Sequence, residues 1–270
     1  MLSTFLTTSY RFPKSRTASL AVAAAVAAAA MAGFAAMSGS AFANEIGIQF
    51  VGNVSTPQPL QASDSAGVVA QTNWNALTGS SWTSQALNDN TGSSSGATLT
   101  GSANGDYFGG SVTDTPGDVK LTSGELFNGW PGSPALSFSN IPYAAYDVYT
   151  YAAIDNNSRI ETIEVTPTGG SASYQSFGTS NGGPAWVLSN NPVAGWNGVG
   201  TQPTRPPSAT YAEFTGLSAS SFTLNWGAPG NGGLNGVQIV EVAVPEPATL
   251  GLMALAGVGI LLIGRKRRLA

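Results

Sequence analysis

The chain is 270 residues long, which at roughly 150 residues per domain allows one or two domains. It contains no histidine and no cysteine, and only 9% of its residues are charged, against about 25% in an average globular protein. The absence of histidine excludes Ser-His-Asp and Cys-His nucleophilic sites and most zinc sites. The absence of cysteine excludes disulfides, iron–sulfur clusters and thiol redox chemistry.

The first 43 residues have the pattern of a secretory signal peptide. Three basic residues come first: Arg11, Lys14 and Arg16. An alanine-rich apolar run over 18–36 follows, and then a small-residue site that ends at Ala41 and Ala43. This order predicts export by Sec-type machinery and removal of 1–43 by signal peptidase. The alternative is an alanine-rich membrane anchor that stays on the chain.

The other end of the chain predicts a single membrane span. Residues 248–264 carry no charge, and at 1.5 Å per residue they reach about 25 Å, the short limit for a bilayer. A basic cluster closes the run: Arg265, Lys266, Arg267 and Arg268. The positive-inside rule holds this cluster in the cytoplasm, so the preceding domain is expected outside the inner membrane.

A proline-rich junction, Val244-Pro245-Glu246-Pro247, stands just before this span. Two prolines around one glutamate cannot continue a helix or join a central strand, which predicts an extended, protease-accessible segment. The tripartite pattern of 244–270, with this junction, an apolar helix and a basic end, resembles the PEP-CTERM sorting tail. The alternative is an ordinary tail anchor behind a proline linker.

The resemblance implies how the protein is sorted. Such tails are substrates of an exosortase, a membrane transpeptidase that cuts at or near the Pro-Glu-Pro sequence. It further implies a Gram-negative host that makes exopolysaccharide, a transient inner-membrane anchor, and a final place in the outer envelope or biofilm matrix. Val244, Pro245, Glu246 and Pro247 would then be recognised by another enzyme and would have no catalytic role.

The middle of the chain, 44–244, is a 201-residue acidic domain. It holds thirteen acidic residues against Lys120, Arg159 and Arg205, so its net charge is −10, whereas the whole chain has −4. This charge disfavours nucleic acid and anionic membrane surfaces as partners. Divalent cations or neutral glycans suit it better.

Short alternating or wholly apolar runs bounded by Gly, Asn, Ser and Pro predict an all-β fold. We expect a single β-sandwich of jelly-roll or galactose-binding-like type. We expect 146–154 to be central and to form a hairpin with 159–166, and 222–226 to form a closing hairpin with 234–240. The expected strands begin at Ile46 and continue over 97–100, 136–139, 146–154, 159–166, 185–188, 211–214, 221–226 and 236–242.

One segment of the domain has two interpretations. Asp64, Asn73, Trp74 and Asn75 could form a glycan platform, with the indole stacked on a sugar ring and the polar groups bound to its hydroxyls. Alternatively, the segment is a loop across the sandwich and Trp74 fills the core. We favour the loop, and a carbohydrate-binding module remains the alternative function.

Three Asp/Asn clusters, at Asp89, Asp106 and Asp155, suggest a Ca²⁺ site, but they lack an EF-hand pattern and suit ordinary turns. Thirteen acidic residues also permit a glycosidase pair roughly 5–9 Å apart, although nothing in the sequence selects one. With no other cofactor indicated and few cations to orient a substrate, we predict a non-catalytic surface or matrix protein associated with exopolysaccharide. A glycoside hydrolase is the least favoured alternative.

Overall fold

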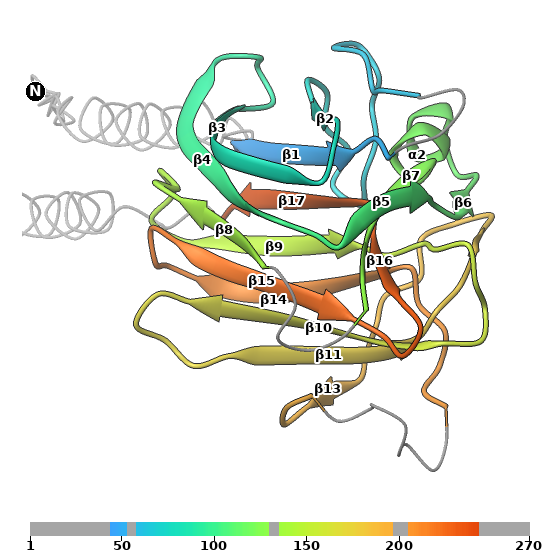
Figure 1. The fold of residues 1–270 in the computed structure, drawn as a ribbon. Coiled ribbons are helices and arrows are strands. Elements are labelled where there is room, and N and C mark those ends of the chain that lie inside the picture. Colours follow the sequence, from blue (N-terminus) through green and yellow to red (C-terminus); the bar gives the residue numbers. More distant parts are fainter. Residues whose placement is uncertain (1–43, 53–57, 130–134, 197–204, 243–270) are drawn as a thin grey trace, which may run out of the picture. The chain divides into compact units, whose positions relative to one another are not determined.

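The computed structural model describes residues 44–52, 58–129, 135–196 and 205–242 (Figure 1). The predicted signal peptide, membrane span and sorting tail lie outside these ranges. Within them, no helix has the length and apolar character needed to span a membrane. The described chain is all-β, as predicted, and the helix in it is α2 (Pro116–Leu121).

Two large sheets form the body of the domain. The first has five strands in the order β14 (Tyr211–Leu217), β9 (Tyr146–Tyr151), β17 (Gly236–Glu241), β1 (Glu45–Phe50) and β2 (Asn75–Leu77). The second has seven, in the order β13 (Pro192–Val193), β11 (Ser173–Gly178), β10 (Ile160–Pro167), β15 (Phe222–Gly227), β8 (Leu136–Ser139), β4 (Ser94–Ser102) and β3 (Ser81–Asn88). Apart from the parallel β1–β2 pair, neighbouring strands in both sheets are antiparallel.

Two small sheets complete the described chain. One pairs β6 (Ser111–Val112) with β12 (Gly182–Gly183). The other places β7 (Gly124–Asn128) between β5 (Gly105–Phe108) and β16 (Gly232–Leu234), and it contributes to the candidate site described below.

The apolar core lies between the two large sheets, which gives the expected sandwich. It is built from alternating side chains, such as Phe222, Leu224 and Trp226 of β15, all at most 1% exposed. The rings of Phe138 and Phe222 stack with centroids 4.7 Å apart. Aromatic side chains bury about 150–250 Å² each, so rings of this kind can hold the sheets together without disulfides.

Two strand pairings differ from the prediction. β9 pairs with β14 and β17, whereas β10 pairs with β11 and β15, so the expected 146–154 and 159–166 hairpin does not form. The connection over 152–159 carries the chain from one sheet to the other. The expected closing hairpin is wrong for the same reason, because β15 and β17 belong to different sheets.

A third difference concerns 185–188, which is not a strand. Leu188 forms an isolated bridge with Tyr211, and the backbone N–H groups of Thr210 and Tyr211 donate to the carbonyl of Val187. Val187 and Leu188 are 48% and 44% exposed, so the apolar run that suggested a strand is not core. The predicted central place of β9 is confirmed, since it lies between β14 and β17.

Candidate functional site

The predicted glycan segment lies over the five-stranded sheet; we call residues 58–74 the covering segment. The Trp74 side chain is 6% exposed, its Nε1 donates to the carbonyl of Gln71 at 3.0 Å, and its ring meets that of Tyr151 edge-on at 6.0 Å. Together with Leu60, Ala66 and Leu121 these rings form a second apolar cluster. Trp74 therefore fills an interior space, as in the interpretation we favoured, and offers no ring face for a sugar.

The polar residues of the predicted platform bind the protein itself. Asn75 Nδ2 donates to the carbonyls of Gly47 and Asn88, each at 2.9 Å, and Asn73 Nδ2 donates to the carbonyl of Asn90 at 2.8 Å. Asp64 Oδ2 accepts from Lys120 Nζ at 2.5 Å, and this bond to Lys120 is the main reason that the pKa of Asp64 is lowered. These four residues fasten a loop, and the structure does not assemble them into a glycan site.

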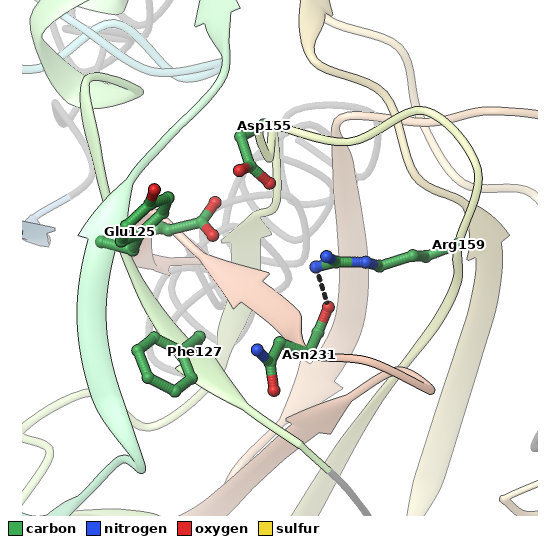
Figure 2. Close-up of a pocket in the computed structure, with 6 residues that line it drawn as sticks. Glu125, Phe127, Asp155, Arg159 and Asn231 are labelled. Carbon is green, nitrogen blue, oxygen red and sulfur yellow. Dashed lines mark hydrogen bonds between the residues drawn. The ribbon is translucent and has the colours of Figure 1, made fainter.

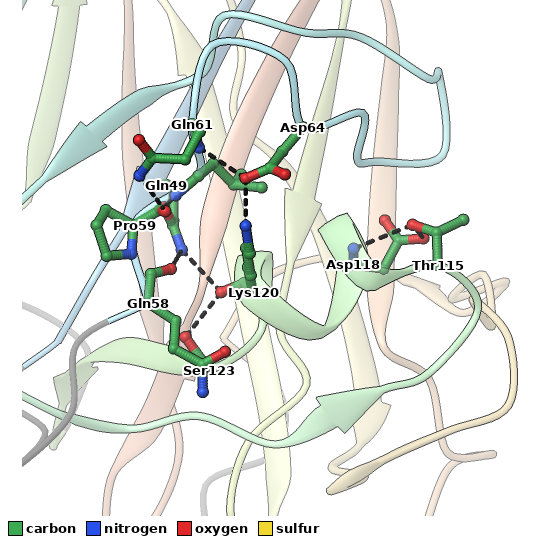
Figure 3. A network of polar contacts seen from close by, with 10 residues as sticks. Gln49, Gln58, Pro59, Gln61, Asp64, Thr115, Asp118, Lys120 and Ser123 are labelled. Carbon is green, nitrogen blue, oxygen red and sulfur yellow. Dashed lines mark hydrogen bonds and ion pairs between the residues drawn. The ribbon is translucent and has the colours of Figure 1, made fainter.

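A polar network anchors the covering segment to α2 (Figure 3). Gln49 Nε2 donates to the carbonyls of Gln58 and Lys120 at 3.0 and 2.7 Å, and Gln49 Oε1 accepts from the N–H of Leu60. At the start of α2, the hydroxyl of Thr115 caps the backbone N–H of Asp118 at 3.2 Å. These hydrogen bonds hold the covering segment and α2 in place.

The predicted calcium residues are dispersed. Asp89 Oδ1 accepts from the backbone and hydroxyl of Thr91 and from the N–H of Ser93, which is a self-contained Asx turn. Asp106 lies in β5, opposite Leu126 of β7. Among the described residues, no three acidic groups gather closely enough to hold a metal ion. Asp155 is one of the residues that line a pocket.

That pocket has a volume of about 250 Å³ and is the candidate site (Figure 2). We call it the Glu125 pocket, and its lining residues are Tyr107, Glu125, Phe127, Asp155, Arg159 and Asn231. In Figure 2 the side chains of Glu125, Asp155 and Arg159 point toward one space, with the ring of Phe127 beside it. The turns before β10 and β16 supply Asp155, Arg159 and Asn231.

The pairing of β5 with β7 explains why aromatic and acidic groups meet here. Tyr107 stands directly opposite Glu125, and Gly105 stands opposite Phe127. Directly opposed residues share a face of the sheet, as do residues two apart on one strand. A Cβ on Gly105 would lie 2.6 Å from the Phe127 ring, so glycine leaves room for that ring to lie flat over β5.

Glu125 is a buried acid at the base of the pocket. It is 3% exposed, and its Oε2 has no hydrogen-bond partner among the described residues. The pKa of Glu125 is raised to about 9, mainly by burial and also by the negative charge of Asp155, while the positive charge of Arg159 opposes the shift. At neutral pH, Glu125 is therefore a neutral carboxylic acid that can donate as well as accept a hydrogen bond.

A second buried acid, Glu161 of β10, lies near Glu125. Its side chain is fully buried, and burial, followed by the charge of Glu125, raises its pKa well above the usual range. The backbone N–H of Gly233 opposes this shift. A Cβ on Gly233 would lie 2.6 Å from Glu125 Oε2 and 2.2 Å from a methyl carbon of Ile154, so only glycine fits beside the acid.

The rim of the pocket is open to solvent. Tyr107 is 47% exposed, and its ring meets that of Phe108 edge-on at 4.8 Å. Arg159 Nη1 donates to the carbonyl of Asn231 at 2.6 Å, and this bond holds the guanidinium across the pocket from Glu125 (Figure 2). The site thus combines an exposed aromatic ring, a neutral acid and a pair of opposite charges.

Sequence comparison identifies the tail of the chain. Residues 243–268 match the PEP-CTERM protein-sorting motif. No curated protein and no solved structure shows significant similarity to the chain. An all-β domain followed by this motif defines an exosortase-targeted secreted surface protein. The chain therefore carries a signal for export and for a membrane-anchored stage that precedes exosortase processing, although the motif itself lies outside the described residues.

Proposed function

We propose that the protein is a non-catalytic component of the outer envelope or of an exopolysaccharide-containing biofilm matrix. The observation that carries the proposal is the sorting motif at 243–268. In this proposal 1–43 is the signal peptide cut after Ala43, 248–264 is the transient anchor, and 265–268 holds its end in the cytoplasm. Residues 44–244 form the single domain that exosortase delivers to its final place.

The non-catalytic role is supported by how the domain uses its cations. Lys120 is ion-paired with Asp64, and Arg205 donates to the carbonyls of Asn157 and Thr179 at 2.6 Å each. Arg159 is hydrogen-bonded to a turn. All three cations of the domain thus have structural partners, and Arg159 also lines the Glu125 pocket.

The sorting step is tested by Pro245→Ala combined with Glu246→Ala in an exosortase-bearing host. We expect the variant to stay in the inner-membrane fraction at the size of the unprocessed chain, while the wild type is processed. Thr249→Ser, just after the motif, is the matched control and is expected to be processed normally. Wild-type protein recovered from the envelope or medium with its tail intact would contradict the proposal.

The non-catalytic claim has its own measurement. Purified full chain incubated with the exopolysaccharide of its host is expected to release no reducing sugar beyond a buffer control. Release that disappears in a Glu125→Gln variant would show that the domain is a hydrolase. A glycan-binding function is the second candidate; it cannot rest on the buried Trp74, but the Glu125 pocket supplies a different surface for it.

A further inference from the structure

We propose that the Glu125 pocket binds one neutral sugar unit of a polysaccharide, with the ring on Tyr107 and a hydroxyl on Glu125. The inference rests on the proposed function, since it names the chemistry by which a matrix protein would hold its matrix.

The lining matches the two-sided character of a sugar. Pyranose rings present C–H groups on their faces and hydroxyls around their edges. Tyr107 and Phe127 offer aromatic surface to the pocket, and Asp155, Arg159 and Asn231 offer hydrogen-bond donors and acceptors to it. A few placed polar groups among aromatic side chains are the usual make-up of a small-molecule site.

The charge of the lining favours an uncharged ligand. Asp155 and Arg159 bring one negative and one positive charge, and Glu125 is protonated at neutral pH because burial holds its proton. The pocket is therefore close to neutral, although the domain around it carries a net charge of −10. An acidic sugar would also be repelled by that surrounding charge.

One carboxyl oxygen of Glu125 has no hydrogen-bond partner among the described residues. Its Oε2 is buried at the base of the pocket without a partner, which costs stability unless a ligand or water supplies one. Glu161, the second buried acid near Glu125, has a pKa that burial also raises well above the usual range. A protonated acid can donate to one sugar oxygen and accept from a neighbouring hydroxyl.

The volume limits what can enter. About 250 Å³ lies just below the range of roughly 300–1,000 Å³ typical of drug-sized ligands. A space of this size accommodates one sugar ring, and the open rim leaves the remainder of the polysaccharide outside the pocket.

The test uses the full chain in a detergent without a sugar headgroup. Its migration is measured in gels that contain a neutral glucan, a neutral galactomannan or the acidic polysaccharide alginate. We expect at least one neutral polysaccharide to retard the protein, its constituent monosaccharide to relieve the retardation, and alginate to have no effect. Retardation by alginate alone, or by none of the three, would overturn the inference.

Variants then place the binding in the pocket. Tyr107→Ala is expected to weaken binding by about fivefold, or about 1 kcal/mol, because the aromatic contact with the sugar is lost. Tyr107→Phe keeps the ring, and Glu125→Gln keeps a neutral donor and acceptor, so both should bind within about twofold of wild type. Glu125→Ala should lose binding.

Two controls keep the outcome interpretable. Leu188→Ala removes an exposed apolar side chain outside the pocket and should leave binding unchanged. Each variant is compared only at temperatures at which its thermal unfolding has not begun. Equal binding by Tyr107→Ala and Leu188→Ala would refute the site, whereas normal exosortase processing of Tyr107→Ala would leave the sorting proposal intact.

Discussion

Tyr151 and Gln238 join the five-stranded sheet to the segment that covers it. The Tyr151 hydroxyl donates to Gln238 Oε1 at 2.6 Å and accepts from the N–H of Val68 at 2.9 Å. Gln238 Nε2 donates to the carbonyl of Val69 at 2.6 Å and to Gln71 Oε1 at 2.8 Å. Two side chains from neighbouring strands therefore supply hydrogen-bond partners to the covering segment. The bond between Tyr151 and Gln238 orients both side chains for these contacts.

Tyr151→Phe tests this junction. The variant keeps the ring but leaves the N–H of Val68 and Gln238 Oε1 without their buried partner, which should lower the free energy of unfolding by about 1–3 kcal/mol. Urea unfolding of the full chain, followed by tryptophan fluorescence, measures the change. Tyr174→Phe, on a partly exposed ring of β11, should shift it by less than about 0.5 kcal/mol. Equal effects of the two substitutions would contradict the role given to Tyr151.

The positions of the strands in the sequence were easier to predict than which strands pair with each other. Phe222, Leu224 and Trp226 alternate in the sequence and are all buried, so the period alone located β15. The same period could not predict that β10 belongs to a different sheet from β9, because the apolar face of a strand can be buried in either sheet of a sandwich. Val187 and Leu188 show the opposite failure, since an apolar pair without a regular period turned out to be exposed.

The candidate site was hidden because Glu125 lies on β7 and Asp155 lies in the turn before β10, far apart in sequence. One signal was available: Glu161 falls in step with Ile163 and Val165, which places an acid on the face that the pattern assigns to the core. A buried acid of this kind often marks a functional site. Its proximity to Glu125 comes from the packing of β10 near the small sheet, which no local pattern encodes.

Trp74→Ala separates stability from binding. The indole is buried in the second apolar cluster, so its loss should lower the free energy of unfolding by about 3–5 kcal/mol. Binding of neutral polysaccharide by the folded protein should be unchanged, because the Glu125 pocket does not include this residue. Calorimetry and affinity gels on the same preparation measure both. A variant of normal stability that fails to bind sugar would restore the surface role for Trp74.

Gly233→Ala tests the close packing beside Glu125. The added Cβ would approach Ile154 Cγ2 to 2.2 Å and Glu125 Oε2 to 2.6 Å, so β16 or the acid must shift. Such overpacking costs about 1–3 kcal/mol, and sugar binding should weaken because the base of the pocket moves. The matched control is Gly195→Ala, where a Cβ meets nothing within 4 Å. Thermal unfolding that is the same in both variants would mean that β16 adapts without strain.

The buried acid at position 125 makes stability depend on pH. Its pKa is raised from 4.5 to about 9, so the folded state holds the proton more tightly than the unfolded state does. The stabilising contribution of that proton is complete below about pH 4.5 and is lost as the pH rises toward 9. Glu125→Gln is neutral at every pH. It should match the wild type near pH 4 and exceed it near pH 9 by up to about 6 kcal/mol, at about 1.4 kcal/mol for each pH unit between 4.5 and 9.

Urea unfolding from pH 4 to pH 9 measures this difference. Glu45, whose pKa burial raises to about 7, is present in both proteins, so its contribution cancels in the comparison. Glu161 does not cancel fully, because the loss of the charge at 125 lowers the pKa of Glu161 and weakens the remaining pH dependence of the variant. Parallel curves for wild type and Glu125→Gln would show that Glu125 is ionised in the folded protein. The pocket would then carry a negative charge, and its preference for a neutral sugar would lose its basis.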